Sequence, residues 1–342
     1  MNVEKRNLRV ISLFLLAGLL LVVAFVLNVI IGSAGISLSD IWGTITGSDE
    51  VSDTTKKIIL GLRLPRTLAA ILSGACLATS GVLLQIFFNN PIVEPYILGV
   101  SSGSNLFVGL VMLAGFNFGM ESISSFGMFV GSFIGAMVIM LCVIIASQKV
   151  KSITTLLIVG MMFSYVCSAV TSFITTLADK EKLTNFTLWS MGSFSGFLWD
   201  DVILLAQISL PFLFCAWIIS KQLNIMILGE KYAQSMGVSI KTFRFLIVFI
   251  SSVLTAVVTA FAGPVSFVGL AVPHIIRILF KTSNNKIVIP AACLFGAVMT
   301  AFCDLCTRTL LSPYEIPLSA ITSIIGAPIL VFLLLRRKEN QF

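Results

Sequence analysis

Few side chains in this sequence could take part in chemistry. The 342 residues contain one histidine, His274, which follows Val272 and Pro273. A lone histidine supplies neither a metal ligand set nor a nucleophile together with its base. All seven cysteines fall in apolar runs, where cysteine behaves as a small hydrophobic residue. The sequence therefore predicts no catalytic residue, no disulfide framework and no metal site.

Charged side chains within or beside apolar runs point to other roles. Asp304 is the one acid well inside such a run, and an acid within a membrane helix is by default a candidate for ion coupling. Arg308 lies four residues later on the same helical face, which favours a local ion pair instead. Arg63 and Arg66 open another apolar run. They could either dock acidic groups of a soluble partner or anchor a helix end at the membrane surface, and their spacing leaves both open.

Composition places these residues in a membrane protein. Hydrophobic residues make up 57% of the chain and charged residues 11%, whereas soluble domains carry about 25% charged residues. A membrane-spanning helix needs about 20 apolar residues, and apolar runs recur along the chain. The predicted helices occupy 8–32, 64–88, 96–115, 123–147, 152–178, 201–222, 242–262, 268–280, 287–308 and 316–335. We therefore predict an all-α membrane protein with about ten transmembrane helices in a single domain, 1–342.

The distribution of lysine and arginine predicts the orientation. With the N-terminus inside, 15 of the 22 lysines and arginines fall on the inner side, as the positive-inside rule requires. Both termini are therefore predicted to be cytoplasmic. The formal net charge of +7 is then a topology signal, so we predict a multi-pass protein of the cell membrane with no nucleic-acid partner.

Two segments depart from simple membrane spans. Val268 to Phe280 is too short to cross a bilayer and contains Pro273, so it should be a short or broken helix and a candidate pathway wall. The longest cytoplasmic loop, about 221–241, contains a predicted short helix from Glu230 to Met236 that Gly237 caps. Such a helix could fit a groove on a cytosolic partner.

Small residues recur every fourth position in two of the predicted helices, at Ala70, Gly74 and Ala78 and at Gly127, Gly131 and Gly135. Stripes of this kind let helices approach closely, and we expect them to pack neighbouring helices within one chain. The sequence has no phosphate-binding Gly-x-x-x-x-Gly-Lys-Ser/Thr motif and no extramembrane stretch long enough for a separate domain. Any ATP chemistry would therefore need a partner subunit.

Several separated motifs resemble the iron-siderophore/haem/cobalamin (FecCD-type) permeases of ABC importers. They follow the family's order over about residues 35–337. The motifs are Arg63-Leu-Pro-Arg66, Ser80-Gly81-Val-Leu-Leu-Gln85, Asn90-Pro91-Ile-Val-Glu94-Pro95, Trp189-Ser-Met-Gly192, Gly229-Glu230, Ala262-Gly263-Pro264 through Pro273-His274, and Arg308-Thr-Leu-Leu-Ser-Pro-Tyr-Glu315-Ile-Pro317 through Pro328.

This resemblance implies a dimer of identical or homologous permeases in membrane lipid, with the pathway between the subunits. It also implies two cytosolic ABC ATPase subunits, which use ATP and Mg, and an extracytoplasmic substrate-binding protein. The chain itself would be no enzyme and would bind no cofactor directly.

The resemblance also implies roles for particular residues. The family's ATPase-coupling positions match Gly229, Glu230, Ala233 and Gly237, and its docking arginines match Arg63, Arg66 and Arg308. Its gate and pathway positions match Asn90, Pro91, Ile92, Thr154 and Thr155. The loop around Thr154 has fewer basic residues than many relatives have, so the chemistry of the gate is less well defined than the coupling.

The expected function is the permease subunit of an ABC importer that takes up an iron chelate, a siderophore or haem, by alternating access. A cobalamin importer of the same family is the alternative. From the residues alone, two other classes stay open: an ion-coupled secondary transporter that uses Asp304, and an intramembrane hydrolase that uses His274.

Overall fold

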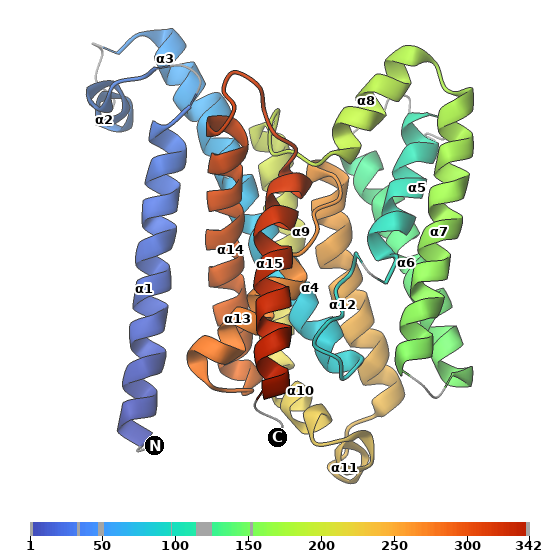
Figure 1. The fold of residues 1–342 in the computed structure, drawn as a ribbon. Helices are drawn as coiled ribbons and strands as arrows, with labels where there is room; N and C mark the ends of the chain where they lie inside the picture. The colour runs from blue at the N-terminus through green and yellow to red at the C-terminus, as the bar shows by residue number, and fades with distance from the viewer. Residues whose placement is uncertain are drawn as a thin grey trace.

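The computed structural model describes residues 3–32, 35–46, 51–96, 98–113, 125–150 and 153–339, and every regular element in these ranges is a helix (Figure 1). Ten apolar helices form the bundle: α1 (Val3–Ile30), α4 (Leu64–Phe87), α5 (Val100–Met112), α6 (Ser125–Lys149), α7 (Ile153–Leu177), α9 (Trp199–Ile218), α12 (Ile240–Ala262), α13 (Val268–Phe280), α14 (Asn285–Thr309) and α15 (Leu318–Glu339). Seven contain a stretch long and apolar enough to cross a membrane, and α5, α13 and α15 carry shorter apolar stretches. The predicted all-α, multi-pass membrane fold is confirmed.

Short helices connect these spans at the two ends of the bundle. One end carries α2 (Leu38–Thr46), α3 (Asp53–Ile58), the π-helix η1 (Ile59–Arg63) and α8 (Lys180–Ser190). The opposite end carries α10 (Ser220–Ile227) and α11 (Glu230–Ser235), together with the start of α1 and the end of α15 (Figure 1). Because the lysine and arginine distribution assigns the termini to the cytoplasm, we call the end with α11 the inner end and the end with α8 the outer end.

Helices α5 and α13 are too short to cross the membrane, and we call such short spans half-helices. Each has 13 residues and so spans about 20 Å, less than the roughly 30 Å of a hydrocarbon core. The expected helix 96–115 begins only at Val100, because residues 89–96 and 98–99 form turns and irregular backbone, with Gly99 at a φ of 80°. A second irregular segment, 263–267, precedes α13. Both irregular segments reach the middle of the bundle (Figure 1).

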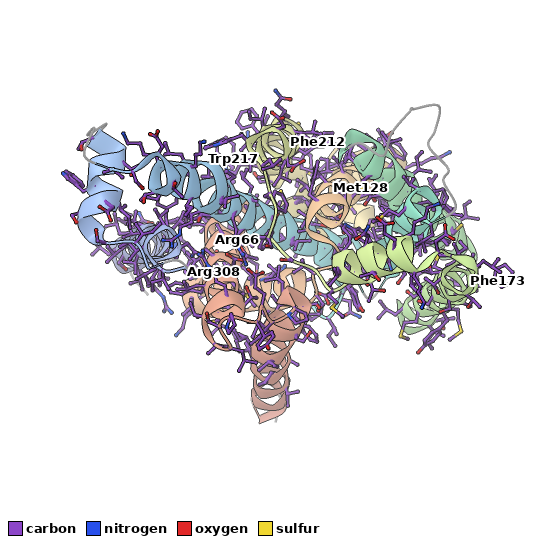
Figure 2. The ribbon with its side chains drawn as sticks, turned by 90° about the horizontal axis from the view of Figure 1, so that it is seen from above. Arg66, Met128, Phe173, Phe212, Trp217 and Arg308 are labelled. Atoms are coloured by element: carbon purple, nitrogen blue, oxygen red, sulfur yellow. The ribbon has the colours of Figure 1, made fainter. Side chains whose placement is uncertain are left out.

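Burial separates central helices from peripheral ones. Helices α4 and α12 are buried along most of their lengths, whereas α1, α7 and α9 leave most of their apolar side chains exposed. Figure 2 shows Phe173 projecting from the bundle while Arg66 and Arg308 lie between helices. Apolar side chains on both the buried and the exposed faces are expected of helices surrounded by lipid.

Close helix packing joins α4 to α14. A Cβ added at Gly74 would overlap the carbonyl oxygen of Gly296 and the hydroxyl of Thr300. That hydroxyl also donates a hydrogen bond of 2.7 Å to the carbonyl oxygen of Ala70. The other stripe packs α6 against α5 through Gly135 in the same way. Both stripes therefore join helices of one chain, as the sequence predicts.

Replacing Gly74 by alanine should destabilise the fold. The added methyl group meets backbone on the facing helix, and overpacking of this kind costs about 1–3 kcal/mol. We expect the midpoint of thermal unfolding of the detergent-purified chain to fall by several degrees. Gly18→Ala is the matched control, because nothing lies within 4 Å of the added Cβ there. Equal midpoints for the two variants would contradict the assigned packing.

Candidate functional site

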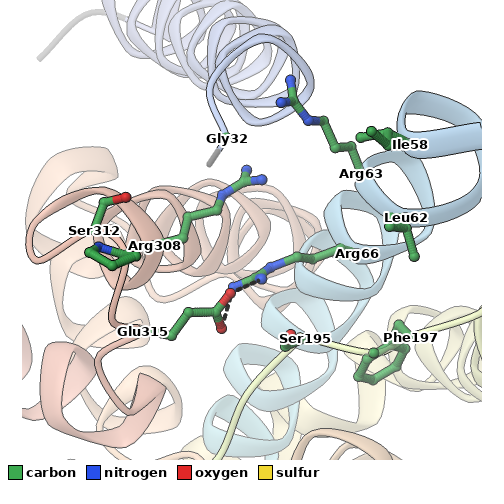
Figure 3. A pocket seen from close by; sticks show the side chains of 12 residues that line it. Gly32, Ile58, Leu62, Arg63, Arg66, Ser195, Phe197, Arg308, Ser312 and Glu315 are labelled. Atoms are coloured by element: carbon green, nitrogen blue, oxygen red, sulfur yellow. Dashed lines mark hydrogen bonds and ion pairs between the residues drawn. The ribbon is translucent and has the colours of Figure 1, made fainter. Parts of the chain in front are cut away.

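A pocket of about 220 Å³ lies at the outer end of the bundle. Its polar lining comes from segments far apart in sequence: Arg63 ends η1, Arg66 lies in the first turn of α4, Arg308 in the last turn of α14, and Glu315 in the loop that follows (Figure 3). The structure thus brings together the three arginines predicted to dock a partner.

Arg66 is the centre of the charge network in this pocket. Its Nη2 lies 2.8 Å from Oδ1 of Asp304, and its Nη1 lies 2.7 Å from Oε1 of Glu315. The Asp304 side chain is only 1% exposed, whereas that of Glu315 is 41% exposed. One guanidinium therefore joins a fully buried carboxylate to a carboxylate that faces the pocket, using the parallel N–H geometry that makes such pairs strong.

The other two arginines bind mainly to the C-terminal end of α1. Arg63 donates from Nη1 to the carbonyl oxygens of Val29 and Ile30, at 2.8 and 2.6 Å. Arg308 donates from Nη2 to the carbonyl oxygen of Asn28 at 2.8 Å and also to its side-chain oxygen. These contacts cap carbonyl groups that the end of α1 leaves without helical partners.

The predicted pair between Asp304 and Arg308 exists but is the weaker one. Arg308 Nε stands 3.8 Å from Asp304 Oδ2, whereas Arg66 makes three hydrogen bonds to the same carboxylate. Sequence reasoning found the neighbour four residues away and missed Arg66, which lies 238 residues away. The pocket lining, with Asp304 behind it, holds three arginines and two acids, so one positive charge remains in excess.

The inner end carries the segment predicted to couple to an ATPase. Helix α11 is closed by hydrogen bonds of 3.0 Å from Val238 N–H to Ala233 C=O and from Gly237 N–H to Gln234 C=O. This is a Schellman motif, with Gly237 in the left-handed conformation at a φ of 82°, so the predicted cap is confirmed. Gly229 is the N-cap of the helix, with a φ of 110°.

One face of α11 is buried against the bundle and the other is exposed. Ala233 is fully buried and belongs to the main hydrophobic core, so this predicted coupling residue anchors the helix. Tyr232 and Met236 are 49% and 58% exposed, and the preceding Leu228 is 67% exposed. Helix α11 therefore presents apolar side chains beyond the inner end of the bundle. Glu230 is its first residue.

The predicted gate residues lie in two segments that meet in one hydrophobic cluster. Asn90, Pro91 and Ile92 form the turn after α4, where Asn90 Oδ1 accepts a hydrogen bond of 3.0 Å from Ile92 N–H. Thr154 and Thr155 lie in the first turn of α7. Phe88 and Val93 beside the first segment and Leu156 beside the second all belong to the same cluster. Both predicted gate segments therefore border the same hydrophobic cluster.

Sequence reasoning missed one buried acid beside the predicted gate turn. Glu94 is 3% exposed, although it lies between two apolar runs, in a position normally read as a surface loop. The signal that could have found it is the pair of flanking prolines and Gly99, which prevent a helix over this segment. Among the residues that the structure describes, no group of three or more histidine, cysteine or acidic side chains could hold a metal ion.

Comparisons with known proteins agree with this architecture. The chain is 31% identical over 331 residues to the hemin transport system permease protein of Yersinia pestis, covering 96% of this chain and 97% of the relative. It is 35% identical to the molybdate import system permease protein of Haemophilus influenzae (94% and 96% covered) and 30% identical to the vitamin B12 import system permease protein of Citrobacter koseri (98% and 97% covered). A solved metal-chelate type ABC transporter in an inward-facing conformation matches with a TM-score of 0.82 at 33% identity, covering 95% of this chain and 99% of that chain.

The bundle of ten apolar helices, with its arginine pocket at one end and a short exposed helix at the other, is the architecture of a multi-pass membrane permease. Residues 20–336 match the FecCD transport family. The chain belongs to this family and is a permease of an ABC importer.

Replacing Asp304 by asparagine should destabilise the outer end. The change leaves Arg66 and Arg308 buried without their shared carboxylate, and breaking a buried ion pair costs about 3–5 kcal/mol. We expect a lower midpoint of thermal unfolding in detergent. Asp179→Asn is the control, because its pair with Lys182 at 3.9 Å is exposed and should contribute less than about 1 kcal/mol. Similar midpoints for both variants would show that the network adds no stability.

Proposed function

We propose that this chain is the membrane subunit of an importer for an iron chelate, a siderophore or haem, which an extracytoplasmic binding protein delivers. The observation that carries the proposal is the family match over residues 20–336, together with the hemin relative and the metal-chelate structure. Cobalamin import is the alternative, favoured by the vitamin B12 relative. A molybdate import permease is also among the relatives, so molybdate is a third cargo to test.

The outer arginine pocket is proposed to receive acidic side chains of the binding protein. Its excess positive charge favours a carboxylate, and guanidinium groups match carboxylates in geometry. Hydrogen bonds to backbone carbonyls of α1 hold Arg63 and Arg308 in place. An arriving carboxylate would therefore bind guanidinium groups that are already fixed in position. Preorganised donors of this kind favour fast and specific docking.

The inner helix α11 is proposed to seat on one of two cytosolic ATPase subunits, which supply the hydrolysis of ATP with Mg. The apolar side chains of Tyr232 and Met236 protrude there, as expected for a helix that fits a partner's groove. Because Ala233 is buried in the core, a movement of α11 would also displace the core residues around it. ATP binding would then shift the populations of two permease states by its differential affinity for them.

The pathway is proposed to run along an open groove of about 450 Å³ beside α15 and the irregular segment 263–267, in a dimer of two permeases. Its side chains include Tyr96, Met191, Ser266 and Ser323, and no charged residue lines it among the residues that the structure describes. Such a surface offers no metal ligand set, so iron would cross as a wrapped chelate and not as a bare ion.

The position of Asp304 disfavours the secondary transporter. Its carboxylate is occupied by Arg66 and Arg308 near the outer end of α14. An ion-coupling acid must exchange its ion during transport, whereas this one is neutralised by two fixed cations.

An uptake experiment in the native host tests the proposed cargo. Cells with and without this chain receive radiolabelled iron as haem or as a ferric siderophore, labelled cobalamin, or labelled molybdate. We expect uptake of an iron chelate alone to depend on the chain, to continue when the ion gradient is collapsed with ATP maintained, and to stop on ATP depletion. Dependence of cobalamin uptake would establish the alternative, and uptake that survives ATP depletion would establish a secondary transporter.

Glu230→Arg tests the coupling role. Reversing a charge at a protein interface costs several kcal/mol, so we expect cargo transported per ATP hydrolysed to fall by roughly tenfold or more, at 1.4 kcal/mol per tenfold. The measurement uses the assembled transporter in proteoliposomes. Lys241→Glu, an exposed inner-side charge outside α11, is the control and should leave the ratio unchanged. A normal ratio in Glu230→Arg would remove the coupling role.

A further inference from the structure

Glu94 is a buried acid that the proposed function does not yet use. Among the acidic side chains that the structure describes, only Glu94 and Asp304 are buried. Asp304 is paired with two arginines, whereas no ion pair of Glu94 occurs among the described residues. A buried carboxylate without a cation is costly unless fixed donors stabilise it, so its surroundings identify its role.

A backbone donor for this carboxylate comes from the start of the half-helix α13. Oε1 of Glu94 accepts a hydrogen bond of 3.4 Å from the backbone N–H of Phe267, the N-cap residue of α13. The N–H of Leu270, three residues further, donates to the carbonyl oxygen of Phe267 at 3.2 Å. The first N–H groups of a helix lack helical acceptors and carry partial positive charge. No side chain of α13's own N-cap supplies this acceptor, so Glu94 caps the helix from another segment.

Packing beside the carboxylate strengthens the same connection. A Cβ added at Gly269 would lie 3.4 Å from Cδ of Pro95 and 3.5 Å from Cα of Gly81 in α4. The ring of Pro95 therefore covers the first turn of α13 next to Glu94. Phe267 in turn packs on Gly326 of α15, the helix beside the proposed pathway.

The other end of α13 is bonded to the same stretch of chain. Arg277 donates from Nη1 to Oε1 of Gln85 at 2.7 Å, and Gln85 is followed by the turn that carries Asn90 to Ile92. Residues 85–95 are thus bonded to α13 both near its inner end, through Gln85, and at its start, through Glu94.

We propose that Glu94 is a positioning residue for the gate: its carboxylate holds residues 90–96 on the N-terminus of α13, so that gate turn and half-helix move as one body. This inference rests on the gate role that the family resemblance predicts for Asn90, Pro91 and Ile92. The bond is suited to that task because a carboxylate at a helix N-terminus is attracted by the helix dipole as well as by the N–H groups.

Hydrogen exchange of the full chain in lipid nanodiscs, read by mass spectrometry, tests this role without cargo or partner proteins. Glu94→Ala removes the acceptor and the charge. We expect amide exchange in 90–96 and in 266–271 to accelerate together by roughly threefold to thirtyfold, the range that corresponds to loss of a helix cap. Exchange in α8 and α11 should stay unchanged.

Two further variants make the result specific. Glu94→Gln keeps an oxygen acceptor but loses the charge, so it should accelerate both segments by a smaller factor, still at least about threefold. Glu181→Ala, an exposed acid of α8, should change neither segment. If the alanine variant does not fold, the glutamine variant decides by the same threefold criterion.

Three outcomes would overturn the proposal: wild-type exchange in the folded Glu94 variants, acceleration of 266–271 alone, or equal acceleration throughout the chain. Because this measurement involves no transport, its failure would leave the importer assignment standing. Failure of the uptake experiment would likewise leave the connection between Glu94 and α13 intact.

Discussion

The close approach of α4 and α14 is the constraint on which the functional arrangement depends. Glycine faces glycine where these helices meet, and the Thr300 hydroxyl bonds directly to backbone of α4. Because the contact is backbone against backbone, the pair has little freedom to slide or separate. The outer ends of the two helices supply Arg66 on one side and Asp304 with Arg308 on the other. The glycine contact therefore sets the distance between α4 and α14 across which the ion pairs form.

The inner ends of the same pair reach the predicted coupling and gate segments. Helix α4 leads into the turn at Asn90, and α14 begins at Asn285, next to its N-cap Asn284. Asn224 of α10 donates to Asn284 and accepts from the N–H of Asn285, both at 2.8 Å. Helix α10 directly precedes α11. A displacement of α11 would therefore act on the inner end of the packed pair α4 and α14, whose outer end carries the arginine pocket. The fold thus offers a short mechanical route between the two proposed docking surfaces.

The sequence predicts those features that local forces decide. Ten apolar segments, the short helix 268–280 and the Gly237 cap follow from hydrophobicity and from backbone preferences within a few residues. The partner of Asp304 could not be found in this way, because Arg66 is brought to it only by packing of α4 on α14. Glu94 was missed for a similar reason. An irregular segment can enter a membrane only where protein covers it, and that cover comes from α13, which is remote in sequence.

The placement of charge also accounts for how a permease of this kind can release its cargo. The arginine network lies at the outer end. In the described part of the chain, the groove proposed as the pathway is lined by serine, methionine, tyrosine, proline and alanine, with no charged group. Glu94, which is buried between α4 and α5, accepts a hydrogen bond from the backbone N–H of Phe267 at the N-terminus of α13, so a donor of this half-helix end is satisfied inside the protein. A fixed uncompensated charge in a buried position would act strongly in a low dielectric and would hold or repel a charged chelate. Because the Glu94 carboxylate is bonded to the start of α13, the predicted gate turn and the half-helix are connected. The groove then attracts the cargo only weakly, as alternating access requires.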